Sequence, residues 1–485
     1  MIETTKIKWF YFFSVLYIAI CGLFVYYEIF WLYLLPVAIA LIMLSFLSID
    51  KLVMFSVLVI PLSVEMKEKD IGVALSLPAE PLIIATMILF VFKALIENTF
   101  DYRIWRHPVT IAICLLLGWG LITTVTSEMP IVSFKSMMNK FWFIIPFYFL
   151  GVHLFKEKKN ITRFAWMYVL GLIAVIIYTT YNHAIWGFEK DPAHWVMTPF
   201  YYDHTQYGVM LAFFVPFLFG YQFINRHQLF VKILVLTALA MVILGLILSN
   251  SRAAWLSVVI AAGFFLIFAF KIKWYLIAGL IGIAAVFLMI NWTSIIQKLE
   301  KNKQDSSQDF TEHIQSMSNI RTDASNLERL LRWNCALRLY RERPVFGWGP
   351  GTYAFVYAPY QKSYELTIIS TNFGDGGNAH SEYLGPLSEQ GFMGIINVLL
   401  VIVMVFYTGS KIIFSKADKY IRYLTMMILL SLITYWFHGI LNNFLDTDKA
   451  AGPYWGFVAM LVAIDLYHVR DDQRKKSKVI EILKV

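Results

Sequence analysis

The sequence predicts an all-α polytopic integral membrane protein, with about 12–14 transmembrane helices and one large helical loop between late helices. Of its residues 59% are hydrophobic and only 15% are charged, and the mean hydropathy is +0.63. Soluble domains are about half apolar and a quarter charged. The apolar residues also form blocks of roughly 17–22, the length that crosses a hydrocarbon core. This composition excludes an ordinary soluble protein.

Apolar segments follow one another along most of the chain, and each is interpreted as one helix. They lie at residues 9–26, 31–48, 52–64, 81–96, 108–126, 141–155, 163–182, 205–224, 229–248, 253–270, 275–293, 392–409, 423–444 and 451–467. The segment 52–64 is short, which fits a tilted or re-entrant helix. The predicted organisation is transmembrane helices with short loops over 1–293, a large periplasmic loop over 294–391, C-terminal transmembrane helices over 392–468 and a basic cytoplasmic tail over 469–485.

The connecting segments predict the orientation. Lys- and Arg-rich connections such as FKEKKNITR, KIIFSKADKYIR and VRDDQRKKSK alternate with the others along the chain. Basic residues are retained on the cytoplasmic side of bacterial membranes, so the large loop is expected to face the periplasm. The net charge of +9 has the same explanation, and we expect membrane lipids and no nucleic acid as partners. The three cysteines do not suggest a disulfide framework.

The large loop begins with a polar segment, 298–325, which is interpreted either as a gate or as a connector. A helix is predicted in SNLERLLRWNCALRLYRERP, where Ser325 and Glu328 form a capping box and Pro344 ends the helix. Its apolar face is predicted at Leu330, Trp333, Leu337 and Tyr340. The turn FGWGPGTY follows, and the loop ends in GGNAHSEYLGPLSEQGFMG. There Asn378 is expected to cap a short helix that holds His380, and Pro386 to bend it.

Two arginines occupy positions that favour an anion site. Arg252, in LILSNSRAAWLSVVI, lies between two apolar segments with almost no loop, where an arginine is costly unless it is paired or functional. Arg329 lies near the start of the predicted loop helix, where the helix end already attracts anions. A guanidinium binds phosphate through two hydrogen bonds, and Ser249 and Ser251 are able to add more. Snorkelling of Arg252 to the interface, and a solvated helix face for Arg329, remain the alternatives.

His380 is the candidate general base, because an imidazole takes up a proton near neutral pH and the surrounding glycines let a ligand approach the backbone. A loop histidine without a chemical role is the alternative. We expect no cofactor and no metal. Acidic and histidine side chains do fall on one side of the membrane, but their spacing matches no metal-binding motif.

Three motifs resemble the O-antigen ligase and polymerase superfamily. NAHSEYLGPLSEQGFMG is similar to the family's histidine signature with its Glu-x-Gly-x-x-Gly. LERLLRWNCALRLYRERPVFGWGPGTY resembles the family's Arg-x-x-x-Trp helix and glycine turn, and SNSRAAWL its Ser-Arg at the end of a span. The resemblance covers about 250–394, and Ser381 replaces an asparagine that is common in the family.

The resemblance implies a GT-C-type membrane glycosyltransferase without metal or nucleotide sugar. It would move a glycan from undecaprenyl pyrophosphate to an acceptor hydroxyl, that of lipid A–core in a ligase and of a second carrier-linked glycan in a polymerase. Position by position, it assigns catalytic roles to Arg252, Arg329 and His380, and we expect substrate binding by Arg252, Arg329, Ser251, Arg332 and Glu389. Protein as the acceptor and a lipid-linked sugar flippase are the remaining alternatives, the flippase disfavoured because no internal repeat is visible.

Overall fold

The computed structural model describes residues 48–68, 73–97, 101–224, 229–272, 328–362 and 377–471. Within these ranges the protein is an all-α membrane protein with one small sheet, and nine of its helices are long and apolar enough to span a bilayer. The expected helices at 9–26, 31–48 (apart from its last residue) and 275–293 lie outside the described residues. So do Ser325 and the polar segment 298–325.

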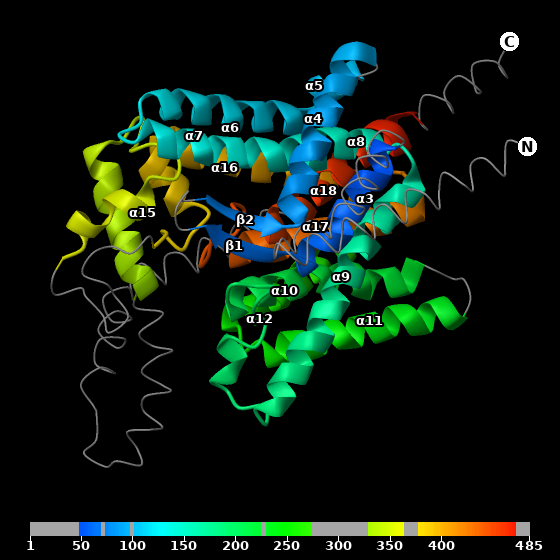
Figure 1. Cartoon of the computed structure of the whole chain (residues 1–485). Coiled ribbons are helices and arrows are strands. Elements are labelled where there is room, and N and C mark those ends of the chain that lie inside the picture. The colour runs from blue at the N-terminus through cyan, green and yellow to red at the C-terminus, as the bar shows by residue number, and fades with distance from the viewer. Residues whose placement is uncertain are drawn as a thin grey trace, which may run out of the picture.

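The described elements are helices and one pair of strands, and several neighbouring helices are joined by short connections (Figure 1). They are α3 (Ile49–Val59), η2 (Ile60–Leu62), β1 (Val64–Glu68), β2 (Val73–Leu77), α4 (Ala79–Glu97), α5 (Tyr102–Trp105), α6 (Pro108–Val125), α7 (Pro130–Ile144), η3 (Ile145–Leu150), α8 (Gly151–Leu154), α9 (Lys158–Ile185), η4 (Pro192–His194), α10 (His204–Ile224), α11 (Leu229–Leu248), α12 (Arg252–Ala269), α15 (Tyr353–Val356), η5 (Ala358–Tyr360), α16 (Leu384–Ile413), α17 (Lys419–His438), α18 (Asp448–Ala463) and η7 (Ile464–Arg470). Residues 328–342 form a further helix, the loop helix.

Helices α17 and α18 form the centre of the bundle. The span that begins with α18 is 94% buried and α17 is 78% buried, whereas the other spans are 22–61% buried. Figure 1 shows the two helices between α6, α7 and α16 on one side and α9 to α11 on the other. Small residues make this possible, because they let helices approach closely in a membrane. A side chain at Gly456 would meet Phe164, and one at Gly452 would meet Ile60.

The segment predicted as a short third span is a helix that ends early and continues into a hairpin. Strands β1 and β2 are antiparallel and pair Val64 with Leu77. The hairpin is joined to α18 by polar contacts: Lys449 Nζ donates to the carbonyl of Ser63 at 2.7 Å, and the Ser63 hydroxyl donates to Asp448 at 2.8 Å. This end of α3 is therefore fixed to the central helix.

The interpretation of residues 127–140 as a connection between the helices predicted at 108–126 and 141–155 is wrong. Helix α7 begins at Pro130 and continues through η3 and α8. Serine side chains in and just before α7 contact protein instead of water. A side chain at Gly349 would meet Ser127 and Ser133, and one at Gly351 would meet Ser136. A polar helix face that packs on a glycine turn cannot be distinguished from a loop by hydropathy.

The predicted apolar face of the loop helix is also wrong. The buried side chains are Leu331, Cys335, Ala336 and Leu339, whereas Leu337 is 38% exposed. The buried face packs on Trp348, Tyr353 and Tyr357 of the following turn. The small side chains of Cys335 and Ala336 leave room for these large rings. The buried face of the helix is therefore set by this packing and not by the spacing of the larger apolar residues. The helix ends just before Pro344, as predicted.

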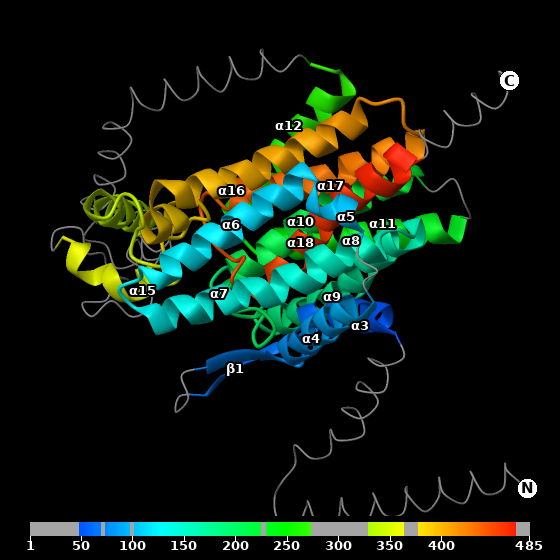
Figure 2. The same ribbon diagram turned by 90° about the horizontal axis from the view of Figure 1, so that it is seen from above.

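The helix bundle has two distinct ends. At the basic end His107 lies 3.3 Å from Asp465, and Arg103 lies 2.7 Å from Asp471. At the other end, the site end, the turn that precedes α16 lies next to the connection between α17 and α18, where Glu382 N donates to Gly439 O at 2.8 Å. The described parts of the large loop lie at the site end (Figure 2).

Candidate functional site

His380 lies in a tight turn at the site end and not in the short helix that the sequence predicted. Its φ of 47° is in the left-handed region, which costs free energy for most non-glycine residues. Asn378 Oδ1 accepts the amide of His380 at 3.0 Å, and Ser381 Oγ accepts the amides of Tyr383 at 3.3 Å and Leu384 at 3.4 Å. Ser381, and not Asn378, thus binds the amides at the start of α16, whose N-cap residue is Tyr383. Backbone strain that is held by the surroundings is typical of functional sites.

The loop helix holds this turn in place. Trp333 Nε1 donates to the carbonyl of His380 at 3.4 Å, and Arg332 donates to the carbonyl of Asn378 at 3.4 Å. Arg332 also pairs with Glu328 at 2.9 Å. A side chain at Gly377 would overlap the Arg332 guanidinium, so this glycine is needed for the close approach. Arg332 therefore positions the histidine turn; direct substrate binding by Arg332 stays a prediction.

Charged groups surround the His380 side chain. Burial is the main cause that lowers its pKa to about 4; the positive charges of Arg332 and Arg329 lower the pKa further, while Asp203 and Glu328 oppose this. The imidazole is therefore neutral at physiological pH, the form that accepts a proton. Burial also lowers the pKa of the Arg329 guanidinium, and the carboxylate of Asp203 raises it.

Asp203 connects this group to the membrane helices. Its Oδ1 accepts the amides of Thr205 at 2.8 Å and Gln206 at 2.7 Å, which caps α10. His438, the last residue of α17, also interacts electrostatically with Arg329 and Asp203. Sequence reasoning gave neither residue a role. The only available signal was that their segments were expected on the same side of the membrane, and that signal does not single out one residue.

Arg252 begins α12 at the same end of the bundle. The preceding turn packs on the first turns of α10, because a side chain at Gly208 would meet both Ser249 and Ser251. Ser251 is buried, and its hydroxyl has no hydrogen-bond partner within the described ranges. The Arg252 side chain is exposed. The helix α10 therefore brings the turn with Arg252 towards Asp203, and through Asp203 towards Arg329 and His380.

Glu389 stabilises the glycine turn of the loop. Its carboxylate accepts the amide of Tyr353 at 3.1 Å, and its carbonyl accepts the amide of Gly349 at 2.7 Å. Helix α16 is interrupted two residues later, at Gly391 rather than at the expected Pro386, with φ of 68°. A side chain at Gly391 would overlap the carbonyl of Val345. The geometry gives Glu389 a structural contact, and substrate binding by Glu389 stays a prediction.

Glu382 fixes the connection between α17 and α18. Its carboxylate accepts hydrogen bonds from the Tyr435 hydroxyl at 2.6 Å and from the amides of Phe444 at 2.8 Å and Leu445 at 3.0 Å. Burial, followed by the nearby charge of Asp446, raises the pKa of Glu382 to about 7 although these hydrogen bonds lower it. Within the described residues, no three or more His, Cys, Asp or Glu side chains are placed to hold a metal ion.

Comparison with known families identifies the region that contains these motifs. Residues 236–399 match the family described as O-antigen ligase. Over these residues the chain is similar to the O-antigen ligase family. The match includes Arg252, Arg329 and His380, and it agrees with a multi-pass membrane protein of the ligase and polymerase type of enzyme.

A relative from Haemophilus influenzae (strain ATCC 51907 / DSM 11121 / KW20 / Rd), described as an uncharacterized protein, is 25% identical over 230 residues. The aligned region covers 47% of the present chain and 55% of that relative. The chain therefore spans about half the length of the relative. The description of that relative names no activity, so this similarity assigns no substrate to the chain.

Proposed function

We propose that the protein is an O-antigen ligase-type glycosyltransferase of the bacterial inner membrane. It moves a glycan from undecaprenyl pyrophosphate to a sugar hydroxyl of lipid A–core, on the periplasmic face and without a metal ion. The observation that carries the proposal is the group formed by Arg329, Asp203 and the neutral His380, beside the turn that begins at Ser249 and contains Arg252. The alternation of basic loops along the sequence supports a periplasmic position for this group.

The chemistry requires a stabilised leaving group. As the bond between the anomeric carbon and the phosphate oxygen breaks, the undecaprenyl diphosphate keeps the bonding electrons and gains negative charge. Arg252 and Arg329 supply fixed positive charge there, and Arg329 is half-buried, so its field is stronger than in water. Asp203 orients Arg329 without needing to touch the substrate.

The acceptor hydroxyl must lose its proton as its oxygen bonds to the anomeric carbon. His380 accepts that proton at a ring nitrogen, which the lowered pKa leaves unprotonated. Arg332 and Trp333 hold the backbone of the turn, so the imidazole does not need to be ordered during the reaction. The products are the extended glycan and the free carrier diphosphate, with one proton on the histidine.

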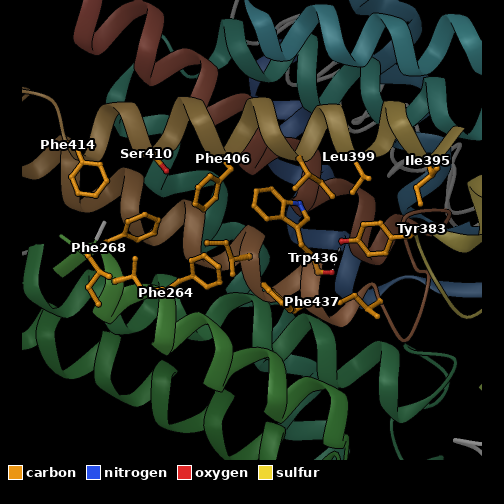
Figure 3. A pocket seen from close by; sticks show the side chains of 15 residues that line it. Phe264, Phe268, Tyr383, Ile395, Leu399, Phe406, Ser410, Phe414, Trp436 and Phe437 are labelled. Atoms are coloured by element: carbon orange, nitrogen blue, oxygen red, sulfur yellow. Dashed lines mark hydrogen bonds between the residues drawn. The ribbon is translucent and has the colours of Figure 1, made fainter. Parts of the chain in front are cut away.

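An apolar groove is suited to the isoprenoid chain of the carrier. Within the described residues a cavity of about 770 Å³ runs between α12, α16 and α17. Figure 3 shows its aromatic lining in a row from Phe414 to Tyr383, which lies three residues after His380. Phe437 also lines the groove, next to His438. Its wall is almost entirely apolar, as a hydrocarbon tail requires.

Purified protein in proteoliposomes with a carrier-linked glycan tests the proposal. Three acceptors are compared in the presence of EDTA: lipid A–core, a second carrier-linked glycan and a protein. We expect the glycan to appear on lipid A–core. Transfer to the second carrier would identify a polymerase, transfer to protein would identify a protein glycosyltransferase, and activity that needs added Mg²⁺ would contradict the metal-independent chemistry.

The proposed base predicts an unusual pH profile. We expect kcat/KM for the donor to stay constant from pH 8 to about 5 and to fall only near pH 4, instead of near the ordinary histidine pKa of about 6.5. The pKa of His380 is lowered because burial and two arginines disfavour the charged imidazole. A lower pH is therefore needed to protonate it. In the donor complex the diphosphate stabilises the imidazolium, and the acid limb of kcat should lie at higher pH.

Rates measured at neutral pH after preincubation in acid separate titration from unfolding. An acid limb of kcat/KM at or above pH 6.5, with the protein intact, would show that His380 is not the titrating group.

A further inference from the structure

A second cavity lies at the site end, and we propose that it holds a sugar ring of the acceptor glycan. The proposal rests on the proposed glycosyl transfer and names a subsite for it. The cavity has a volume of about 230 Å³ and lies between α7, the first turns of α16 and the connection between α17 and α18. It is separate from the Arg329 group, and its volume is below the roughly 300–1,000 Å³ of pockets for drug-sized ligands. A single ring is therefore the expected occupant.

The cavity borders the histidine turn through the residues that flank His380. Asn378, Ala379 and Ser381, the neighbours of His380 in the chain, line it. The His380 side chain itself interacts with Arg329, Arg332 and Asp203. A ring in the cavity would thus lie next to the reacting sugar and not at the anomeric carbon.

Unpaired amide groups indicate that the cavity takes a hydrogen-bonding ligand. Gln390 is only 1% exposed and lines the cavity, and within the described part of the chain its Nε2 has no hydrogen-bond partner. Asn443 also lines the cavity, and its buried Oδ1 likewise has no hydrogen-bond partner within the described residues. The Gln390 backbone is fixed, because its carbonyl accepts Trp119 Nε1 at 2.8 Å. A buried amide without a partner is costly, and a sugar hydroxyl both donates and accepts.

The remaining lining suits a neutral polyhydroxyl ring. Aromatic side chains supply flat apolar faces, and they are Tyr353, Tyr435, Trp436, Tyr454 and Trp455. The charged lining consists of Glu382, Glu389, Asp446 and the single cation Lys140. Three carboxyl groups against one amine disfavour a diphosphate or another anion. They accept hydrogen bonds from hydroxyl or amino groups, so a hexose or an amino sugar fits, and the carrier diphosphate belongs on the arginine side.

The cavity is also placed where a glycolipid head would emerge from the membrane. Tyr383 and Trp436 line both the cavity and the apolar groove. These two side chains form a shared wall, fixed by hydrogen bonds from Tyr383 to the Trp436 carbonyl at 2.8 Å and from Trp436 Nε1 to Tyr454 at 3.1 Å. The sugar subsite is therefore next to the groove and separated from it by ordered side chains.

Binding is tested without turnover, by saturation-transfer NMR of the purified full chain with methyl glycosides of glucose, galactose, heptose and N-acetylglucosamine. The variant Gln390→Leu keeps the size of the side chain and removes its polar atoms. The matched control is Gln222→Leu, because Gln222 Nε2 is also buried without a partner in the described residues, but near the basic end of α10. We expect signals in the wild type and in Gln222→Leu, and none in Gln390→Leu. No signal in the wild type, or an equal signal in Gln390→Leu, would overturn the subsite.

Kinetics provide the second readout. Gln390→Leu should raise KM for the acceptor by about five- to tenfold, as expected for one or two lost hydrogen bonds, and change KM for the donor by less than about twofold. Leu116→Phe, which narrows the cavity from α6, should act in the same direction. An equal rise in both KM values would contradict the subsite. Wild-type protein that transfers no glycan to any acceptor would refute the proposed function, whereas the NMR result stands independently of turnover.

Discussion

Replacing Arg329 with alanine is expected to lower kcat/KM for glycan transfer by about 100- to 1,000-fold. The leaving diphosphate then loses a fixed positive charge in a half-buried site, where no water molecule replaces a preorganised guanidinium. Arg329→Lys should recover only part of the rate, because an ammonium cannot form the paired hydrogen bonds of a guanidinium. Donor binding should weaken together with the rate, since the ground-state diphosphate is also charged.

Arg341→Ala is the matched control for this prediction. Arg341 is on the same loop helix, and its side chain is exposed, so its loss should change the rate by less than about twofold. Arg252→Ala is expected to cause a loss comparable to that of Arg329→Ala. The proposal has both arginines acting on one diphosphate, so the double variant should lose less than the product of the single losses. Full activity of Arg329→Ala in proteoliposomes would remove the leaving-group role.

Replacing His380 with asparagine is expected to lower kcat by about 100- to 10,000-fold, the usual contribution of a general base. Asparagine is the appropriate substitute because, like histidine, it tolerates the left-handed backbone found at this position. The fold of the turn should therefore persist while the proton acceptor is lost. Donor affinity should remain within a few-fold of the wild type, in contrast to Arg329→Ala.

Arg329→Ala and His380→Asn distinguish stabilisation of the leaving group from proton transfer, because each role has its own measurement. Equilibrium binding of the carrier-linked glycan reports on the arginine, and single-turnover rates report on the histidine. Unimpaired single-turnover rates in His380→Asn would exclude a base at this position. Lost donor binding in the same variant would instead indicate that His380 contacts the substrate without moving a proton.

Much of the fold could be predicted because hydropathy reports directly on membrane spans. The segments expected at 81–96, 229–248 and 253–270 agree with α4, α11 and α12 within a few residues. Errors occurred where helices meet protein instead of lipid. The first turns of α7 and the buried face of the loop helix are decided by contacts with the glycine turn, and neither length nor periodicity contains that information.

The candidate site was predictable in part for a similar reason. Arg252, Arg329 and His380 stand out as polar residues in unusual places, and their motifs resemble one family. Asp203 has no such signal: it is one of many loop carboxylates until α10 places it beside Arg329. Arg332 and Glu389 stay predicted substrate contacts, and the structure adds hydrogen bonds through which both hold the loop.

The sequence by itself determined the membrane class, the expected sidedness and the motifs, because each depends on composition or on order along the chain. Only the tertiary structure decided which charges meet. Segments more than a hundred residues apart in sequence converge at the site end, where burial and neighbouring charges keep His380 neutral. Burial and electrostatic fields depend on distances in space, and a linear sequence does not contain these distances until the chain has folded.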